Sequence, residues 1–176
     1  MRTRTGLAAL SLAVSAMALT GACTEDHPGP SRPPSWEGKA EQEDAMERAA
    51  RALNAAGAEG DVRVDEGMED LDRGLDKTFE AKGDHPYSLD IACQAPTDRT
   101  VTLTLARGGS HSEWEVTCGD READRFSVPA GGRFTATIAS AGEAGGAADG
   151  LVLWRLSTRP PGDMEGCDDD IKGCES

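Results

Sequence analysis

The 176-residue sequence is poor in basic and in aromatic side chains. Lysine and arginine together number 18, against 32 aspartates and glutamates, which gives a formal net charge of −14. Proteins that bind nucleic acid neutralise phosphates with basic residues, so this charge argues against nucleic acid as a partner. Aromatic residues make up 4% of the chain, which is few for a carbohydrate-binding face built on stacked rings.

Several motifs of metal and cofactor chemistry are also absent from the sequence. No two cysteines have the Cys-x-x-Cys spacing, so the sequence predicts neither a thioredoxin-like redox motif nor a zinc knuckle. The glycines between residues 142 and 150 lack the following helix and lysine of a phosphate-binding loop. We therefore expect no cofactor.

The first 22 residues have the layout of a secretory signal peptide. Residues 1–5 contain two arginines, and residues 6–22 are uncharged and dominated by alanine and leucine. This apolar run is shorter than the ~20 residues of a comfortable membrane span, and no basic flank follows it. The small residues Gly21 and Ala22 immediately precede Cys23, where they leave a peptidase room to reach the peptide bond.

Residues 1–23 resemble bacterial lipoprotein precursors, in which a lipobox of hydrophobic and small residues ends at an invariant cysteine. Here Thr20 stands three positions before Cys23, where leucine is commonest, and Leu19 stands one place further out. The resemblance implies a diacylglycerol on Cys23 and further acylation of its amino group, and two or more acyl chains anchor a protein stably. The protein would then lie on the outer face of the cell membrane. The alternative is an ordinary secreted protein cleaved after Ala22.

The mature chain is strongly acidic. Residues 1–22 contain two arginines and no acidic residue, so removing them leaves 16 basic and 32 acidic residues and a net charge of −16. A domain of this charge should stand away from an anionic membrane. Residues 23–38 are rich in proline and predict a semi-extended spacer. The composition, rich in alanine, glycine, aspartate and arginine with only four lysines, is similar to that of actinobacterial lipoproteins.

Residues 39–57 predict a helix, because they are mostly good helix formers and end at Gly57, a residue suited to a C-cap. One narrow apolar stripe follows the helical period and comprises Met46, Ala49, Ala50 and Leu53. We expect this stripe and Trp36 to pack on the chain's own domain. Docking of the stripe onto a partner is the alternative.

Residues 58–158 predict a small antiparallel β-sandwich of about seven strands, so the fold class is mainly β. From residue 75 onward, apolar residues alternate with polar ones and turn-rich segments separate the strands. The segment before residue 75 has conflicting signals, although Val62–Val64 is typical of a short strand. The last strand, residues 151–156, is apolar on both faces and should lie in the centre of its sheet or beneath the helix. The architecture loosely resembles small immunoglobulin-like or CUB-like domains.

Four cysteines remain when Cys23 is set aside, and an even number in an exported chain favours disulfides. Cys93 and Cys118 both fall on the apolar face of their predicted strands, so we expect them to be bonded. The other pair is then Cys167 with Cys174, although four cysteines allow three pairings.

Residues 159–176 predict a solvated acidic tail. Its carboxylates include Asp168, Asp169 and Asp170, which are weak candidates for a calcium site beside the predicted Cys167–Cys174 bridge. The spacing is not that of an EF-hand, because the Asp-x-Asp-x-Asp-Gly pattern and the distal glutamate are absent.

The sequence offers no convincing catalytic group. Ser110–Glu113 contains the residue types of a hydrolytic triad, but adjacency along the chain is not triad geometry. Neither His85 nor His111 has a recognisable partner, and we expect Trp114 and Trp154 to be core residues. The sequence therefore favours a non-catalytic envelope protein that binds another protein or a glycan, or has a structural role. A small envelope hydrolase and a calcium-binding surface protein are the alternatives.

Overall fold

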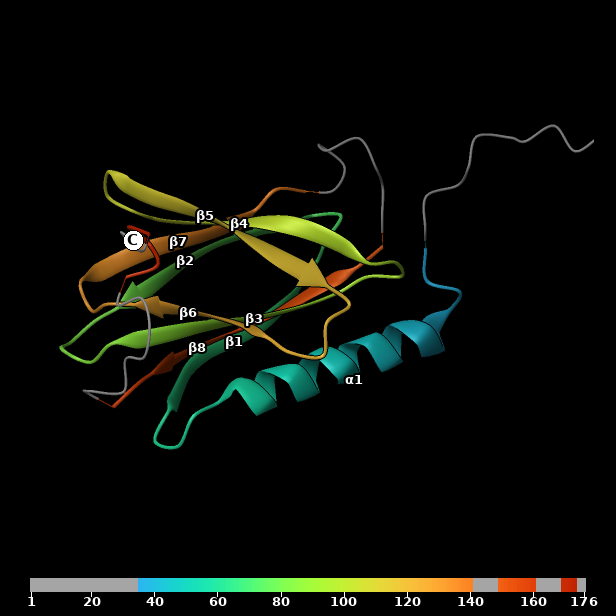
Figure 1. Ribbon diagram of the computed structural model, residues 1–176, viewed down its shortest axis with the longest axis horizontal. Helices are drawn as coiled ribbons and strands as arrows, with labels where there is room; N and C mark the ends of the chain where they lie inside the picture. The colour runs from blue at the N-terminus through green and yellow to red at the C-terminus, as the bar shows by residue number, and fades with distance from the viewer. Residues whose placement is uncertain (1–34, 141–148, 161–168, 174–176) are drawn as a thin grey trace, which may run out of the picture. The chain divides into compact units, whose positions relative to one another are not determined.

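The computed structural model describes residues 35–140, 149–160 and 169–173 (Figure 1). One helix precedes eight strands: α1 (Lys39–Ala56), β1 (Val62–Asp70), β2 (Leu75–Ala81), β3 (Tyr87–Gln94), β4 (Arg99–Arg107), β5 (Ser110–Cys118), β6 (Asp124–Val128), β7 (Gly132–Ile138) and β8 (Leu151–Thr158). The strands form two four-stranded antiparallel sheets with the orders β1-β8-β3-β6 and β2-β7-β4-β5. The mainly β, two-sheet fold with an N-terminal helix is as expected. Within these residues, no helix is both long enough and apolar enough to cross a membrane.

The core lies between the two sheets and explains the period-two pattern of the sequence. Every second residue of the paired strands turns inward, and the fully buried side chains include Leu89, Leu103, Leu105, Phe134 and Leu156. Trp154 belongs to this core, as predicted, whereas Trp114 is only half-buried and packs at its margin. Alternation is therefore the signal of one face of each sheet meeting the other.

The expected seven strands are in fact eight, because β1 continues through the whole of Val62–Asp70. It pairs with β8 and forms one edge of its sheet, with an irregularity in register between Arg63 and Asp65. Most of β1 is exposed or half-buried, so it lacks the alternation of a core strand. The sequence pattern failed here because pairing with β8, and not burial, holds this strand in place.

Strand β3 is buried along its whole length, including the residues that the alternation predicted to face solvent. These residues, Ser88, Asp90 and Ala92, lie on the outer face of the sheet. Helix α1 covers part of this face, where Ala92 and Leu151 pack with it (Figure 1). The central position of β8 and its cover by α1 confirm the interpretation of its two apolar faces.

Helix α1 ends at Ala56 as predicted, but it is rotated relative to the expected stripe. The buried residues are Ala45, Ala49, Ala52 and Leu53, whereas Met46 is exposed. Alanines face the sheet because their small side chains let the helix approach closely. Gly57 has a φ of −59° and so is not the left-handed C-cap that glycine commonly provides. Trp36 packs against the helix–sheet cluster as expected.

The expectation of a solvated tail is wrong for the described residues 169–173. Ile171 is 1% exposed and belongs to the inter-sheet core. The Asp170 N–H donates to Ser127 O of edge strand β6 over 2.9 Å, and Trp114 Nε1 of edge strand β5 donates to Asp170 O over 2.9 Å. The segment therefore closes the side of the sandwich between β5 and β6. A single isoleucine among acidic residues gave too weak a signal for this docking.

Candidate functional site

A groove with a volume of about 520 Å³ lies between α1 and the edge strand β1. It exists because α1 packs over β3 and β8 and leaves the outer face of β1 uncovered. Its lining side chains come from three elements: Met46, Ala50, Leu53 and Asn54 from α1, Arg63, Glu66, Gly67 and Met68 from β1, and Leu153, Trp154 and Arg155 from β8. The groove is therefore apolar at its centre and charged at one end.

The exposed hydrophobic side chains lie on the two elements that border this groove, and two of them, Met46 and Met68, line it. Among the described residues, the large ones are Met46, Val62, Val64 and Met68, with exposed fractions of 41%, 62%, 50% and 46%. All four belong to α1 or β1, although the described chain contains seven other strands. Exposed apolar side chains that cluster in one place mark interaction surfaces, whereas scattered ones do not.

The charged end of the groove is built into the sheet. Glu66, Arg155, Asp90 and Arg125 lie opposite one another on β1, β8, β3 and β6, so acidic and basic side chains alternate across all four strands. Arg155 Nε lies 3.3 Å from Glu66 Oε2, and Arg155 Nη1 donates to Leu53 O at the end of α1 over 3.1 Å. This row ties the end of α1 to the sheet.

The part of this row that lies on β3 and β6 is the most buried. Arg125 Nε donates to Asp90 Oδ1 over 2.7 Å, and Arg125 Nη2 donates to Asp61 Oδ2 over 3.1 Å. Burial lowers the pKa of Arg125, but the hydrogen bond and charge of Asp90, together with Asp61, outweigh this and leave the pKa raised. An arginine held in this way stays charged, so the row is a permanent part of the structure.

The floor of the groove ends at Trp154, which lies directly opposite Gly67 across the β1–β8 pair. On its inner side, Lys77 of β2 places its ammonium group 4.5 Å from the centre of the indole ring. The Lys77 Nζ also lies 3.6 Å from Asp65 Oδ2 of β1. These contacts join the β1 and β2 edges of the two sheets.

The cysteine prediction is confirmed where the structure describes it. Cys93 of β3 and Cys118 of β5 form a disulfide with a Cα–Cα distance of 4.4 Å. The bond joins the two sheets, because β3 and β5 belong to different ones. The predicted lipidation site Cys23 and the predicted pair Cys167–Cys174 lie outside the described residues.

Of the three candidate calcium ligands, the structure describes Asp169 and Asp170, and each carboxylate has another contact. Asp170 Oδ2 accepts from the Ser127 N–H over 2.5 Å, and Asp169 Oδ2 lies 3.4 Å from Lys172 Nζ. Asp168 lies outside the described residues. A search of the described residues found no group of three histidine, cysteine or carboxylate side chains able to hold a metal ion. Burial of Asp170 raises its pKa, and its Ser127 contact only partly opposes this.

The structure separates the residues of the triad-like segment. Strand β5 alternates Ser110, His111, Ser112 and Glu113 across its two faces, so His111 and Ser112 point in opposite directions. The Ser112 hydroxyl donates to Ile171 O over 3.1 Å and so has a structural contact. His85 is exposed, with its Nε2 3.8 Å from Asp84 Oδ1. This segment cannot act as a triad in this geometry.

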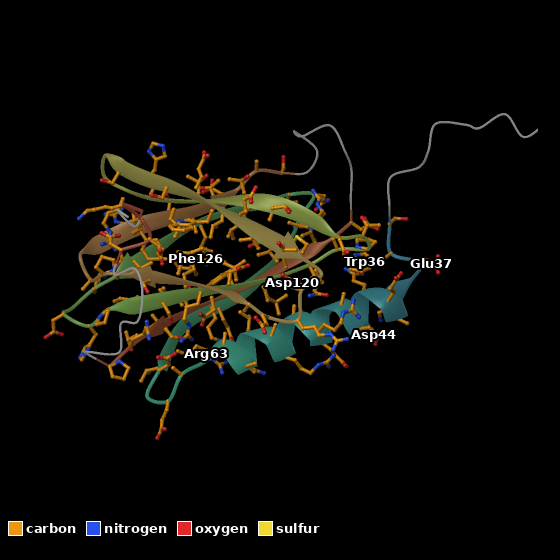
Figure 2. The ribbon with its side chains drawn as sticks, viewed as in Figure 1. Trp36, Glu37, Asp44, Arg63, Asp120 and Phe126 are labelled. Atoms are coloured by element: carbon orange, nitrogen blue, oxygen red, sulfur yellow. A yellow bond between two sulfur atoms is a disulfide. The ribbon has the colours of Figure 1, made fainter. Side chains whose placement is uncertain are left out.

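Two further groups of carboxylates were not singled out by the sequence. A polar hollow of about 370 Å³ at the start of α1 is lined by Trp36, Gln42, Asp70, Asp72 and Asp149. Figure 2 shows Trp36 and Arg63 near opposite ends of α1, so this hollow and the charged end of the groove are well apart.

The second group of carboxylates is Asp120 and Asp124. Burial, and then the charge of Asp120, raise the pKa of Asp124. Asp124 lines neither the hollow nor the groove.

The groove itself was missed by the sequence interpretation. Met46 belongs to the stripe that the sequence predicts to pack on the domain, and Met68 lies in the segment before residue 75 whose signals conflict. The useful signal was a methionine, Met68, placed among the acidic residues at the end of its strand, together with a methionine in the helix, Met46.

Comparisons with known proteins identify no family for this chain. No protein-family model matches it, and no curated protein matches it. Among solved structures, the chain is similar to one in the crystal structure of Drosophila melanogaster CENP-C bound to CAL1. The similarity has a TM-score of 0.31 and 16% sequence identity, and covers 68% of this chain and 99% of that one.

Proposed function

We propose that this chain is an exported, membrane-anchored protein without catalytic activity, which binds a partner protein in the groove between α1 and β1. The observation that carries the proposal is the gathering of all the large exposed hydrophobic side chains of the described residues on these two elements. A groove with an apolar centre and a few fixed polar groups at its end is the usual form of a recognition site.

The apolar centre supplies affinity. Complete burial of a methionine side chain contributes roughly 1.5–3 kcal/mol, so covering the half-exposed Met46 and Met68 contributes roughly 1 kcal/mol each. Leu153 widens the apolar floor between them. These contributions suit a moderate, reversible interaction once the entropic cost of association is included.

The charged end of the groove orients the bound partner. Glu66 pairs with Arg63 over 2.7 Å and with Arg155 over 3.3 Å, so its carboxylate is held in one place before any partner arrives. A partner need not order these side chains when it binds, and this lowers the cost of association.

The membrane anchor rests on the sequence. A diacylglycerol on Cys23, followed by the proline-rich spacer to residue 38, would hold the domain near the outer face of the membrane while leaving the groove accessible. The intact mass of the protein from a detergent-extracted membrane fraction tests this part. We expect the mass of residues 23–176 plus the lipid, and the unmodified mass in the culture medium would refute the anchor.

Cross-linking in intact cells, followed by affinity capture, tests the binding site. The Met46→Glu and Met68→Glu variants place a charge in the apolar centre and should lose most of the captured partner. The matched control is Thr100→Glu, which adds the same charge on an exposed residue of β4 opposite the neutral Thr117. A partner captured equally by all three variants would refute the groove as the site.

A further inference from the structure

The outer edge of β1 is available for pairing with another strand. In its sheet, β1 has β8 on one side and no strand among the described residues on the other. The opposite edge strand, β6, has its backbone partly occupied by Asp170, which exchanges hydrogen bonds with Ser127. The two edges therefore differ, and only β6 is covered by the described part of the chain.

The charge of β1 decides what can pair with it. Four of its nine residues are acidic, Asp65, Glu66, Glu69 and Asp70, and Arg63 is the only basic one. A second copy of the chain pairing through this edge would place like charges opposite one another, which destabilises a strand pair. A segment with lysine or arginine at alternate positions would instead meet opposite charges.

The register of β1 decides where the partner's apolar residues would lie. Glu66 and Met68 oppose Arg155 and Leu153, and all four line the groove. A strand added beside β1 would direct every second side chain toward that same face. Apolar side chains at those positions would therefore reach Met68 and the apolar centre of the groove, while the intervening ones lie near Asp65 and Glu69.

From these observations we propose that the partner presents an extended segment of alternating basic and apolar residues, which adds to β1 as a fifth strand of its sheet. The proposal rests on the proposed function, since it names the chemistry of the partner at the same groove. The irregular register between Arg63 and Asp65 limits regular pairing to Asp65–Asp70, so about six residues of the partner take part.

A synthetic peptide tests the proposal. The probe is a capped nine-residue peptide of alternating lysine and valine, titrated into the mature protein and followed by amide hydrogen exchange. We expect slower exchange along Asp65–Asp70 and unchanged exchange in the other edge strands. Two control peptides, one with glutamate for lysine and one with the lysines and valines in separate blocks, should leave β1 exchange unchanged.

Two charge-reversal variants separate strand addition from general attraction to an acidic protein. Glu69→Lys changes the charge on β1, and Glu115→Lys makes the same change on the exposed edge strand β5. Because Glu69→Lys replaces one exposed attraction of about 0.2–1 kcal/mol by a repulsion of similar size, we expect it to weaken peptide binding about two- to thirtyfold. We expect Glu115→Lys to weaken it less than twofold. Equal weakening by both variants would overturn the proposal.

The outcomes for this proposal and for the proposed function are distinguishable. If the Met46→Glu and Met68→Glu variants lose the cellular partner but the alternating peptide gives no protection of β1 at millimolar concentration, strand addition is wrong and the groove stands. If cellular capture survives both methionine variants, the groove itself is wrong. Protection of β5 or β2 in place of β1 would also overturn strand addition.

Discussion

The indole ring of Trp154 on β8 occupies the position that a side chain at Gly67 on β1 would need. A Cβ atom at Gly67 would lie 2.5 Å from Trp154 Cζ2 and 3.2 Å from Trp154 Nε1. The glycine therefore lets the edge strand pass close to the ring, and the ring fills the space that an ordinary residue would fill. This contact connects the edge strand, the groove and the inter-sheet core.

Replacing Gly67 by alanine should destabilise the fold, because either the indole or the backbone of β1 must move. We expect a loss of roughly 1–3 kcal/mol in the free energy of unfolding, measured by urea denaturation. Gly109→Ala is the matched control, since a Cβ there meets no atom within 4 Å. Equal stability of the two variants would show that the ring moves freely.

The Cys93–Cys118 disulfide should account for a large part of the net stability. It closes a loop with a sequence separation of 25 residues, for which the chain-entropy treatment gives about 3.5 kcal/mol. We expect the Cys93→Ala/Cys118→Ala double variant to lose about this free energy of unfolding. The double variant should also be far less sensitive to a reducing agent than the natural protein. Retention of the natural protein's full stability under reduction would contradict this expectation.

The docking of residues 169–173 predicts unequal effects at two adjacent positions. Ile171 is buried in the core, so Ile171→Ala should cost about 2–5 kcal/mol in the free energy of unfolding. The Lys172 side chain is 71% exposed, so Lys172→Ala should change stability by less than about 0.5 kcal/mol. A freely solvated tail would instead make both substitutions neutral in thermal or chemical unfolding.

The raised pKa of Asp170 predicts a specific dependence of stability on pH. For a carboxyl group whose pKa is raised on folding, the stabilising contribution is complete below its ordinary pKa of ~3.9 and is lost as the pH rises through the higher folded value. Asp170→Asn keeps an oxygen that can accept from the Ser127 N–H but removes this titration. We expect the variant to be at least as stable as the natural protein at pH 7.

Acidification should then remove the advantage of the Asp170→Asn variant. Between pH 7 and pH 3.5, the free energy of unfolding of the natural protein should rise relative to that of the variant as the pH falls. Glu59→Gln, at an exposed position, is the control and should leave the difference from the natural protein constant over this range. If the natural protein instead became less stable relative to Asp170→Asn on acidification, the raised pKa of Asp170 would be refuted.

The sequence predicted the parts of the fold in which burial follows a simple period. Strands β2, β4, β5 and β7 have one face in the core, and Cys93 and Cys118 fell on that face in their own strands. The alternation was therefore sufficient for these strands and for the disulfide. The full length of strand β1 was not predicted, because the strand is exposed and its partner β8 lies far away in the sequence.

The groove was harder to predict, because it depends on the relative placement of three elements. The helical period alone could not decide whether Met46 or Ala45 would face the sheet, since both lie near the apolar side. The burial of Asp90 could not be predicted either. Its carboxylate is paired with Arg125 of another strand, and the sequence does not show the register that brings the two residues together. Ile171 docks through long-range contacts that no local pattern contains.

The place of β8 has a consequence for the order of folding. This last strand lies between β1 and β3, and its residues Leu151 and Leu153 also support α1. Strands β2, β7, β4 and β5 come from residues 75–138 and can assemble earlier, and α1 also packs on β3, whereas β1 must wait for its partner in residues 151–158. A chain released N-terminus first therefore keeps its first strand unpaired until its last strand emerges.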